Sequence, residues 1–262
     1  MMGKVFLVGA GPGDPELLTV KALRLLQSAD AVLHDELVAP GILRHVNPGA
    51  WVKNVGKRCG SKRVTQEEIN FLMVSLAAAG QQVVRLKGGD PLIFGRAREE
   101  ITALRRARIP FEIVPGISAA LGAAAALQTP FTARRGPAAV VLLTGHREND
   151  ERSDWRELAR SGATLVLYMP GRNYGEISRR LRRAGMDGQT PCAIVSRATT
   201  PGERVHVTTV AELAAAPVLE APALLIVGEV VRQAAGHLSF ASLPPNSALQ
   251  FHAESLRKEV TP

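Results

Sequence analysis

The sequence predicts an α/β protein built on a doubly wound, mostly parallel sheet, and two observations support this fold class. Short apolar segments rich in β-branched residues alternate with segments of helical periodicity along most of the chain. Glycine-rich loops follow the first of these strands and a later one, at the positions where open α/β sheets bind ligands. The length of 262 residues allows one large domain or two smaller ones.

The first half of the chain supplies one alternating series. We expect strands at 4–8, 31–33, 51–55, 82–86 and 111–114, and helices at 16–28, 66–79, 96–107 and 118–127. Asp14 is placed to cap the first helix with Pro15 in its first turn. Thr65 and Glu68 have the spacing of a capping box, which marks the start of the second helix.

A second alternating series follows Pro130, Gly136 and Pro137, which interrupt the patterns. It predicts strands at 139–144, 164–169, 192–196, 204–209 and 223–227, and helices at 155–160, 175–184 and 210–215. We therefore expect an N-terminal domain at 1–133 and a C-terminal domain at 134–240. Residues 241–262 have little periodicity and are expected to form an appended tail.

The chain carries a surplus of positive charge, +8, from 32 Lys and Arg against 24 Asp and Glu. Such a surplus suits nucleic acid, an anionic surface or a polyanionic small molecule. The basic pairs have almost no aromatic neighbours, which argues against nucleic acid; they are Arg105–Arg106, Arg134–Arg135, Arg179–Arg180 and Arg182–Arg183.

From composition and the N-terminal residues we expect a protein of the cytoplasm. The longest apolar runs, such as 138–143, fall far below the roughly 18 residues of a membrane span. The N-terminal residues lack the charged region and cleavage site of a secretory signal. Cys59 and Cys192 lie far apart without metal-ligand spacing, so we expect inert thiols, no disulfide and no metal site.

The first glycine loop, GAGPGDP at 9–15, is close to a dinucleotide-binding fingerprint, with an acid, Asp35, about 20 residues further on. Asp14 stands where that fingerprint needs its third glycine, and Pro12 and Pro15 remove amide donors. The loop is thus a poor cradle for a pyrophosphate. A tight turn without a ligand and an NAD-dependent oxidoreductase remain alternatives for these residues.

The second glycine loop, GGDP at 88–91, ends a buried strand. Gly88 and Gly89 allow the backbone to approach a ligand closely. Asp90 would accept hydrogen bonds from hydroxyls or hold a cation, but it would repel a phosphate. The loop therefore favours a nucleoside or amino-acid moiety, although Asp90–Pro91 alone would also suit a helix cap.

Charged residues gather at the ends of the same strands, namely Asp35, Lys57, Arg58, Arg96 and Glu99. Arg96 and Glu99 are three residues apart in a predicted helix and so would share one face. Their convergence on one rim predicts a polar site for an acidic ligand.

Seven segments resemble the uroporphyrinogen-III C-methyltransferases of the tetrapyrrole methylase superfamily: GAGPGDPELLT, HDELV, GKRCG, TQEEIN, VVRLKGGDPLIFGR, VPGISAA and LLTGH. The similarity extends from about Lys4 to about Val231. GPGDP and GGDP are shared across the superfamily, including cobalamin-pathway enzymes and diphthine synthase. GKRCG, TQEEIN and GGDPLIFGR in this order are specific to the uroporphyrinogen branch.

This resemblance implies two α/β domains, with a mostly parallel N-terminal sheet, a mixed C-terminal sheet and the ligand cleft between them. It implies a homodimer that uses S-adenosyl-L-methionine and no metal. The reaction would methylate uroporphyrinogen III at rings A and B and give precorrin-2 for sirohaem or cobalamin synthesis. A methylase of a later corrinoid intermediate is the alternative within the superfamily. The eight carboxylates of uroporphyrinogen III suit the cationic surplus of the chain.

The resemblance also assigns the site residues. It places the methyl donor against Pro12, Gly88, Gly89, Asp90, Ile93, Ser118, Ala119, Met169 and Ala198. Relatives commonly have Thr at the position of Ser118 and Gly at that of Ala198. The proton acceptor would be Asp35 and the proton donor Lys57, while Arg96, Glu99 and Arg134 would meet the tetrapyrrole. Asp35 and Glu99 both remain candidates for the base, and Lys57 could equally bind a substrate carboxylate.

Overall fold

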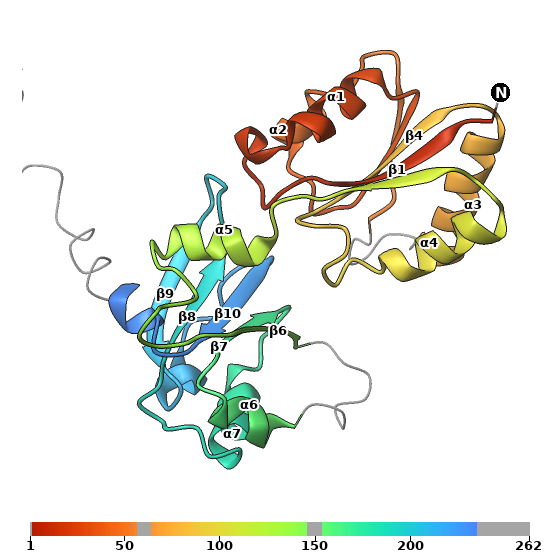
Figure 1. Ribbon diagram of the computed structural model, residues 1–262. Coiled ribbons are helices and arrows are strands. Elements are labelled where there is room, and N and C mark those ends of the chain that lie inside the picture. Colours follow the sequence, from red (N-terminus) through yellow and green to blue (C-terminus); the bar gives the residue numbers. More distant parts are fainter. Residues whose placement is uncertain (1, 57–63, 146–153, 235–262) are drawn as a thin grey trace, which may run out of the picture.

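The computed structural model describes residues 2–56, 64–145 and 154–234 (Figure 1). Within them lie two five-stranded sheets, one parallel and one mixed, each covered by helices. The predicted fold class is therefore confirmed.

The first sheet has the strand order β3-β2-β4-β1-β5, and its neighbouring strands pair in parallel. The strands are β1 (Lys4–Gly9), β2 (Ala31–His34), β3 (Trp51–Asn54), β4 (Gln82–Lys87) and β5 (Phe111–Val114). From β2 the chain continues to β3 on one side, whereas from β4 it continues to β5 on the other. Adjacent strands with diverging connections open a crevice at their carboxyl ends, so the topology favours a ligand between the ends of β2 and β4.

Helices cover both faces of this sheet: α1 (Val20–Ser28) and α2 (Pro40–Leu43) on one, α3 (Gln66–Ala78) and α4 (Ala97–Arg106) on the other (Figure 1). The predicted capping box at Thr65 and Glu68 is present at the start of α3. The prediction that the first helix begins at residue 16 is wrong. Asp14 caps only the short 3-10 turn Pro15–Leu17, and the Thr19 hydroxyl then accepts a bond from Ala22 N and starts α1 at residue 20.

The second sheet has the order β6-β7-β10-β8-β9. Its strands are β6 (Val140–Thr144), β7 (Thr164–Tyr168), β8 (Pro191–Ser196), β9 (Arg204–Thr209) and β10 (Ala223–Val227). β6 and β7 are parallel and the other pairs antiparallel, as expected for a mixed sheet. One face is covered by α6 (Trp155–Arg160), α7 (Tyr174–Arg183) and the 3-10 turn η3 (Glu212–Ala215), which replaces the helix predicted at 210–215.

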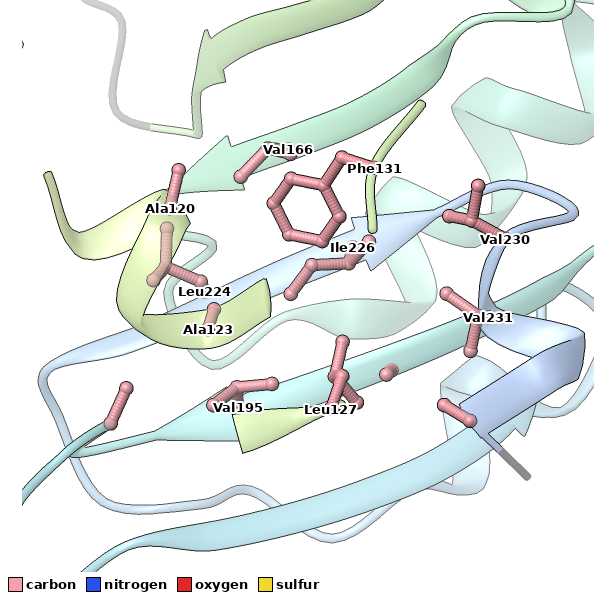
Figure 2. Close-up of a cluster of buried hydrophobic side chains, with 13 residues drawn as sticks. Ala120, Ala123, Leu127, Phe131, Val166, Val195, Leu224, Ile226, Val230 and Val231 are labelled. Atoms are coloured by element: carbon pink, nitrogen blue, oxygen red, sulfur yellow. The ribbon is translucent and has the colours of Figure 1, made fainter. Parts of the chain in front are cut away.

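Helix α5 (Ala119–Ala126) covers the opposite face of the second sheet (Figure 2). Ala120 and Ala123 of the helix, with Leu127 directly after it, pack into one apolar cluster with residues such as Val195 and Leu224. The helix thus follows the last strand of the first sheet in sequence but contributes to the core of the second. The domain division at residue 133 stays a prediction.

Two further findings concern membrane-spanning helices and the cysteines. Among the described residues no helix has the length and apolar character that a membrane crossing requires. Cys192 is a free, buried cysteine, and burial raises the pKa of its thiol to about 12. This thiol is protonated at neutral pH, in line with the inert role predicted for it; Cys59 lies outside the described residues.

Candidate functional site

The two glycine loops form one surface at the carboxyl ends of β1 and β4. Gly11 N donates to the Gly89 carbonyl oxygen at 3.2 Å, and Gly89 N donates to the Gly11 carbonyl oxygen at 2.7 Å. Ala10 N donates to the carbonyl of Lys87 at 2.7 Å. These residues are almost 80 positions apart in sequence, so the pattern of either loop alone could not predict the pairing.

Three glycines allow the strand ends to come this close. A Cβ added at Gly116 would lie 2.4 Å from the Gly89 oxygen, and one at Gly9 would lie 2.5 Å from the Gly116 Cα. Gly89 also has a φ of +67°, which favours glycine. An alanine at these points would push the strand ends apart.

The first loop has few amides left for a phosphate. The amide of Ala10 donates to Lys87 at the end of β4, that of Gly11 to Gly89 in the second loop, and that of Asp14 to Thr199 Oγ1 at 3.2 Å. Pro12 and Pro15 have no amide hydrogen. This arrangement agrees with the sequence argument against a pyrophosphate cradle, and hence against the NAD alternative.

The carboxylate of Asp90 joins the second glycine loop to the loop that follows β5. Oδ1 accepts from Leu92 N at 2.8 Å, and Oδ2 accepts from Gly116 N at 3.1 Å. A carboxylate offers about four acceptor positions, so Asp90 retains capacity for a ligand hydroxyl. Asp90 therefore both caps the local turn and faces the loop surface on which a donor would lie.

Tyr168, at the end of β7, connects the second sheet to this surface. Its hydroxyl lies 3.2 Å from Ser118 Oγ and accepts from Ala120 N at 3.1 Å. Its ring packs against Phe94, with centroids 5.0 Å apart. Neither aromatic residue was singled out from the sequence. The sequence could have indicated them, because Tyr168 is next to the predicted Met169 and Phe94 is next to the predicted Ile93. Aromatic residues make up only 4% of the chain, so two beside predicted site residues stand out.

Further contacts bring together most of the predicted donor residues. A Cβ at Gly122 would lie 2.8 Å from the Cβ of Pro12, and one at Gly13 would lie 3.3 Å from the Ala198 oxygen. A Cβ at Gly89 would be 3.5 Å from Ala119 N. Pro12, Gly89, Asp90, Ser118, Ala119, Met169 and Ala198 thus surround the junction of the first sheet, α5 and the second sheet. Ile93 follows Asp90 in the same turn, its amide 3.3 Å from the Asp90 oxygen. Gly88 lies against Leu37, just past β2.

Left-handed backbone conformations are concentrated in the same loops. The residues with φ between +50° and +63° there are Phe94, Arg96, Met169, Arg197 and Thr199. Arg108 and Gln128 share this conformation but directly follow the C-terminal caps of α4 and α5, where it is common. Backbone conformations that non-glycine residues seldom adopt tend to persist at functional sites. Their location supports the loop junction as the site.

A network of four charged side chains lies beside the second loop. Arg85 contacts Asp35 and, through Nε, Glu100 Oε1 at 2.8 Å. Lys87 Nζ lies 3.0 Å from Glu100 Oε2. Arg85, Lys87 and Glu100 are buried, whereas the Asp35 side chain is 29% exposed. Burial, followed by the nearby Arg85 charge, lowers the pKa of Lys87. Asp35 is thus the member of the network that reaches solvent.

Arg96 and Glu99 pair with each other. Arg96 Nε and Nη2 each donate at 2.8 Å, to Oε1 and Oε2 of Glu99, in a bidentate and half-exposed contact. The prediction that Arg96 begins the helix is wrong, because its φ of +55° makes it the residue before α4. A substrate carboxylate that bound Arg96 would have to share it with Glu99 or displace Glu99.

Among the described residues, no contact draws Arg134 into the site. Arg134 is exposed in the turn between α5 and β6. Lys57 lies outside the described residues. The roles predicted for both residues stay predictions.

Part of the positive charge lies far from the loops. Arg179, Arg180, Arg182 and Arg183 are on α7, which Figure 1 places at the end of the second domain remote from β1. Glu176 pairs with the first two. The net charge of the chain is therefore a weak guide to where an anionic ligand binds.

The chain matches the family of tetrapyrrole (corrin/porphyrin) methylases over residues 4–214 and belongs to this family. Two curated relatives are siroheme synthase 2 of Aeromonas hydrophila, 47% identical over 232 residues, and siroheme synthase of Neisseria meningitidis serogroup B, 48% identical over 231. These alignments cover 88% and 87% of this chain but 49% and 48% of the relatives. The chain thus spans about half the length of these relatives.

Solved structures show the same similarity. A uroporphyrin-III C-methyltransferase of Thermus thermophilus complexed with S-adenosyl homocysteine is 42% identical, with a TM-score of 0.77. The match covers 88% of this chain and 100% of that one. A cobalt precorrin-4 methyltransferase has a TM-score of 0.78 at 31% identity, over 87% of this chain and 95% of that one.

Proposed function

We propose that the protein transfers methyl groups from S-adenosyl-L-methionine to uroporphyrinogen III, at rings A and B in two successive steps, and releases precorrin-2. The observation that carries this proposal is the 42% identity to the Thermus thermophilus uroporphyrin-III C-methyltransferase, over the whole length of that enzyme. That enzyme was solved with S-adenosyl homocysteine, the demethylated donor. The product would enter the synthesis of sirohaem, as the names of the curated relatives suggest, or of cobalamin.

The loop junction fits such a donor. S-adenosyl-L-methionine supplies an electrophilic methyl group on sulfur and carries no phosphate. Backbone atoms of Gly88 and Gly89 can approach its amino-acid or nucleoside part, and Asp90 can accept a bond from a ribose hydroxyl. Ser118 and Ala119 at the start of α5, with Met169 and Ala198 from the second domain, would enclose the remaining side.

The acceptor would lie where charged and apolar side chains meet. Arg96 and Arg134 can bind carboxylates in bidentate fashion. Leu92, Phe94 and Met169 are exposed by 55%, 41% and 48%, and they offer an apolar surface to the macrocycle. In-line positioning of a pyrrole carbon toward the methyl group would supply much of the rate.

Asp35 and Glu99 are the carboxylates available to accept the proton that the methylated macrocycle loses. Glu99 is already engaged in its bidentate contact with Arg96. Asp35 follows β2 at the crevice favoured by the topology, and Asp35 N donates to the Leu86 oxygen at 3.1 Å, which ties it to the end of β4. We therefore propose Asp35 as the base and Glu99 as a residue that orients Arg96.

Anaerobic incubation of the purified protein with uroporphyrinogen III and the donor tests this function. Mass spectrometry should detect a product that has gained two methyl groups, together with S-adenosyl-L-homocysteine. If uroporphyrinogen III gains no methyl group, the proposal is wrong.

A methylase of a later corrinoid intermediate is the second candidate, favoured by the TM-score of 0.78 to the cobalt precorrin-4 enzyme. The two TM-scores are almost equal, so the fold does not separate the candidates, whereas the identities of 42% and 31% favour uroporphyrinogen III. The same incubation with cobalt precorrin-4 in place of uroporphyrinogen III distinguishes them.

We also propose that the protein is a cytoplasmic homodimer. The support is its resemblance to the uroporphyrinogen-III methyltransferases. Light scattering after size-exclusion chromatography should give about twice the chain mass of 28.0 kDa. A mass of one chain at assay concentration would contradict the dimer.

A further inference from the structure

Beneath the second glycine loop, the proposed chemistry leaves three buried charges without a role. Arg85 and Lys87 alternate with Leu86 on β4 and so point to the face covered by α3 and α4. Glu100 projects from α4 and is 0% exposed. Val83, two residues before Arg85 on the same face, packs in the apolar core. The strand thus changes from apolar to charged as it nears the candidate site.

Stability alone is a poor explanation for this network. Removing charges from water is expensive, and apolar residues of similar volume are often as stable or more stable in such places. With Asp35 the network has two positive and two negative groups, so it is balanced only if all four members are kept. The one member that reaches solvent is Asp35, the residue proposed to accept the proton.

The guanidinium of Arg85 is fixed from several directions. Nε donates to Glu100 Oε1 at 2.8 Å, and Nη1 donates to the carbonyls of Leu33 and Leu86 at 3.3 and 3.2 Å. Nη2 donates to Asp35 Oδ1. A planar group bonded at all three nitrogens has little freedom to turn. It therefore holds Oδ1 of the Asp35 carboxylate in one place.

Glu100 is fixed in turn by Lys87. Lys87 Nζ lies 3.0 and 3.1 Å from the two Glu100 oxygens. The backbone of Gly95 lies close to the side chain of Lys87, since a Cβ at Gly95 would be 3.1 Å from Lys87 Cε. A chain of contacts therefore begins at Lys87, below the loop that precedes α4. It passes through Glu100 and Arg85 and ends at the partly exposed carboxylate of Asp35.

We propose that Glu100 is a positioning residue for methyl transfer: held by Lys87, it fixes Arg85, and Arg85 fixes the Asp35 carboxylate in the orientation that accepts a proton. This inference rests on the proposed function. It predicts that Glu100 acts on the reaction through Asp35 alone.

The test compares Glu100→Gln, Asp35→Asn and the double variant by kcat and KM for uroporphyrinogen III and by calorimetric binding of S-adenosyl-L-homocysteine. Glu100→Gln keeps the volume of the side chain and should lower kcat about tenfold, because small misplacements of reacting groups are costly. KM for uroporphyrinogen III and the affinity for S-adenosyl-L-homocysteine should change less than about twofold. Asp35→Asn should lower kcat about 100-fold or more, as expected for loss of a general base. In the Asp35→Asn background, Glu100→Gln should cause no further loss, since the effects of coupled residues do not add.

Glu112→Gln is the matched control, because Glu112 also pairs with two cations, Lys4 and Lys21, but at the amino ends of the strands. It should leave kcat and KM unchanged. A second variant, Lys87→Met with Glu100→Gln, removes one charge of each sign and should lower kcat as Glu100→Gln does.

Three outcomes would overturn the positioning role. They are an undiminished kcat in Glu100→Gln, full additivity in the double variant, and loss of S-adenosyl-L-homocysteine binding in the charge-balanced variant. The last would assign the network to the donor loop. A wild-type protein that does not methylate uroporphyrinogen III would instead refute the proposed function, which separates the two failures.

Discussion

Two glutamates of the first domain each bind two cations, but at opposite ends of the parallel sheet. Glu112, near the amino end of β5, contacts Lys4 and Lys21 with 31% of its side chain exposed. Glu100 contacts Arg85 and Lys87 near the carboxyl end of β4 and is completely buried. The same residue types therefore meet water at one end of the sheet and exclude it at the other.

The exposed pairs of Glu112 and the buried pairs of Glu100 contribute to the protein in different ways. Solvent screens an exposed pair, so it contributes little to stability. A buried group must keep every partner, because a single unpaired charge there is costly. In an open α/β sheet the carboxyl ends of the strands bind ligands, and that is the end at which this chain buries charge.

Removing the buried carboxylate should produce the largest effect on stability. Glu100→Ala leaves Arg85 and Lys87 with Asp35 as their carboxylate partner, so it should lower the free energy of unfolding by about 3–5 kcal/mol. Chemical denaturation of the variant beside the wild type measures the loss. A change no larger than that of Glu112→Ala would contradict the contrast between the two ends.

Asp90→Ala should act mainly on the donor. The variant loses the proposed contact with the ligand, the bond from Leu92 N within the local turn and the bond from Gly116 N that joins two loops. Binding of S-adenosyl-L-homocysteine should weaken by about 100-fold, or about 2–3 kcal/mol, as expected when hydrogen bonds to a charged group are lost. Isothermal titration calorimetry measures this affinity. An unchanged affinity would show that Asp90 does not belong to the donor site.

Arg96→Ala should act on the acceptor and spare the donor. KM for uroporphyrinogen III should rise about tenfold, because one charge-assisted contact is worth about 1.5–3 kcal/mol when buried and less when half-exposed. Binding of S-adenosyl-L-homocysteine should stay unchanged. If donor binding were lost instead, the proposed division between donor and acceptor residues would be wrong.

Glu112→Gln should have the smallest effect, a small loss of stability near neutral pH that disappears in acid. Hydrogen bonds from Lys21 and Lys4 lower the pKa of the Glu112 carboxyl from 4.5 to about 2. Because this pKa is lower in the folded than in the unfolded state, the carboxylate stabilises the folded protein at pH values above about 4.5. That stabilisation is lost as pH falls from about 4.5 to about 2. The difference in thermal midpoint between variant and wild type should therefore shrink across this window. A constant difference down to pH 2 would contradict the assignment.

Local patterns were sufficient to predict most elements but not their contacts. β-Branched runs located the strands, and β5, β9 and β10 match the predicted ranges. The start of the first helix was predicted wrongly, because two caps, Asp14 and Thr19, compete within six residues. The left-handed conformation of Arg96 depends on the loop before it, so helical periodicity did not reveal it.

The candidate site was predictable residue by residue but not as an assembly. Motif resemblance named Gly89, Asp90 and Ser118, whereas the bridge from Gly11 to Gly89 and the contact of Ser118 with Tyr168 join distant segments. The sequence does contain a signal for the buried network. Arg85 and Lys87 interrupt a segment otherwise interpreted as a buried strand, and charged residues in such a position require partners.

The central claim is that the junction of the two glycine loops with α5 holds the methyl donor and faces Asp35. A crystal structure of the protein with S-adenosyl-L-homocysteine tests it most directly. We predict that the ligand contacts backbone atoms of Gly88 and Gly89 and the Asp90 carboxylate, with its sulfur toward the side on which Asp35 is exposed. S-adenosyl-L-homocysteine bound elsewhere, or with its sulfur turned away from Asp35, would contradict the account.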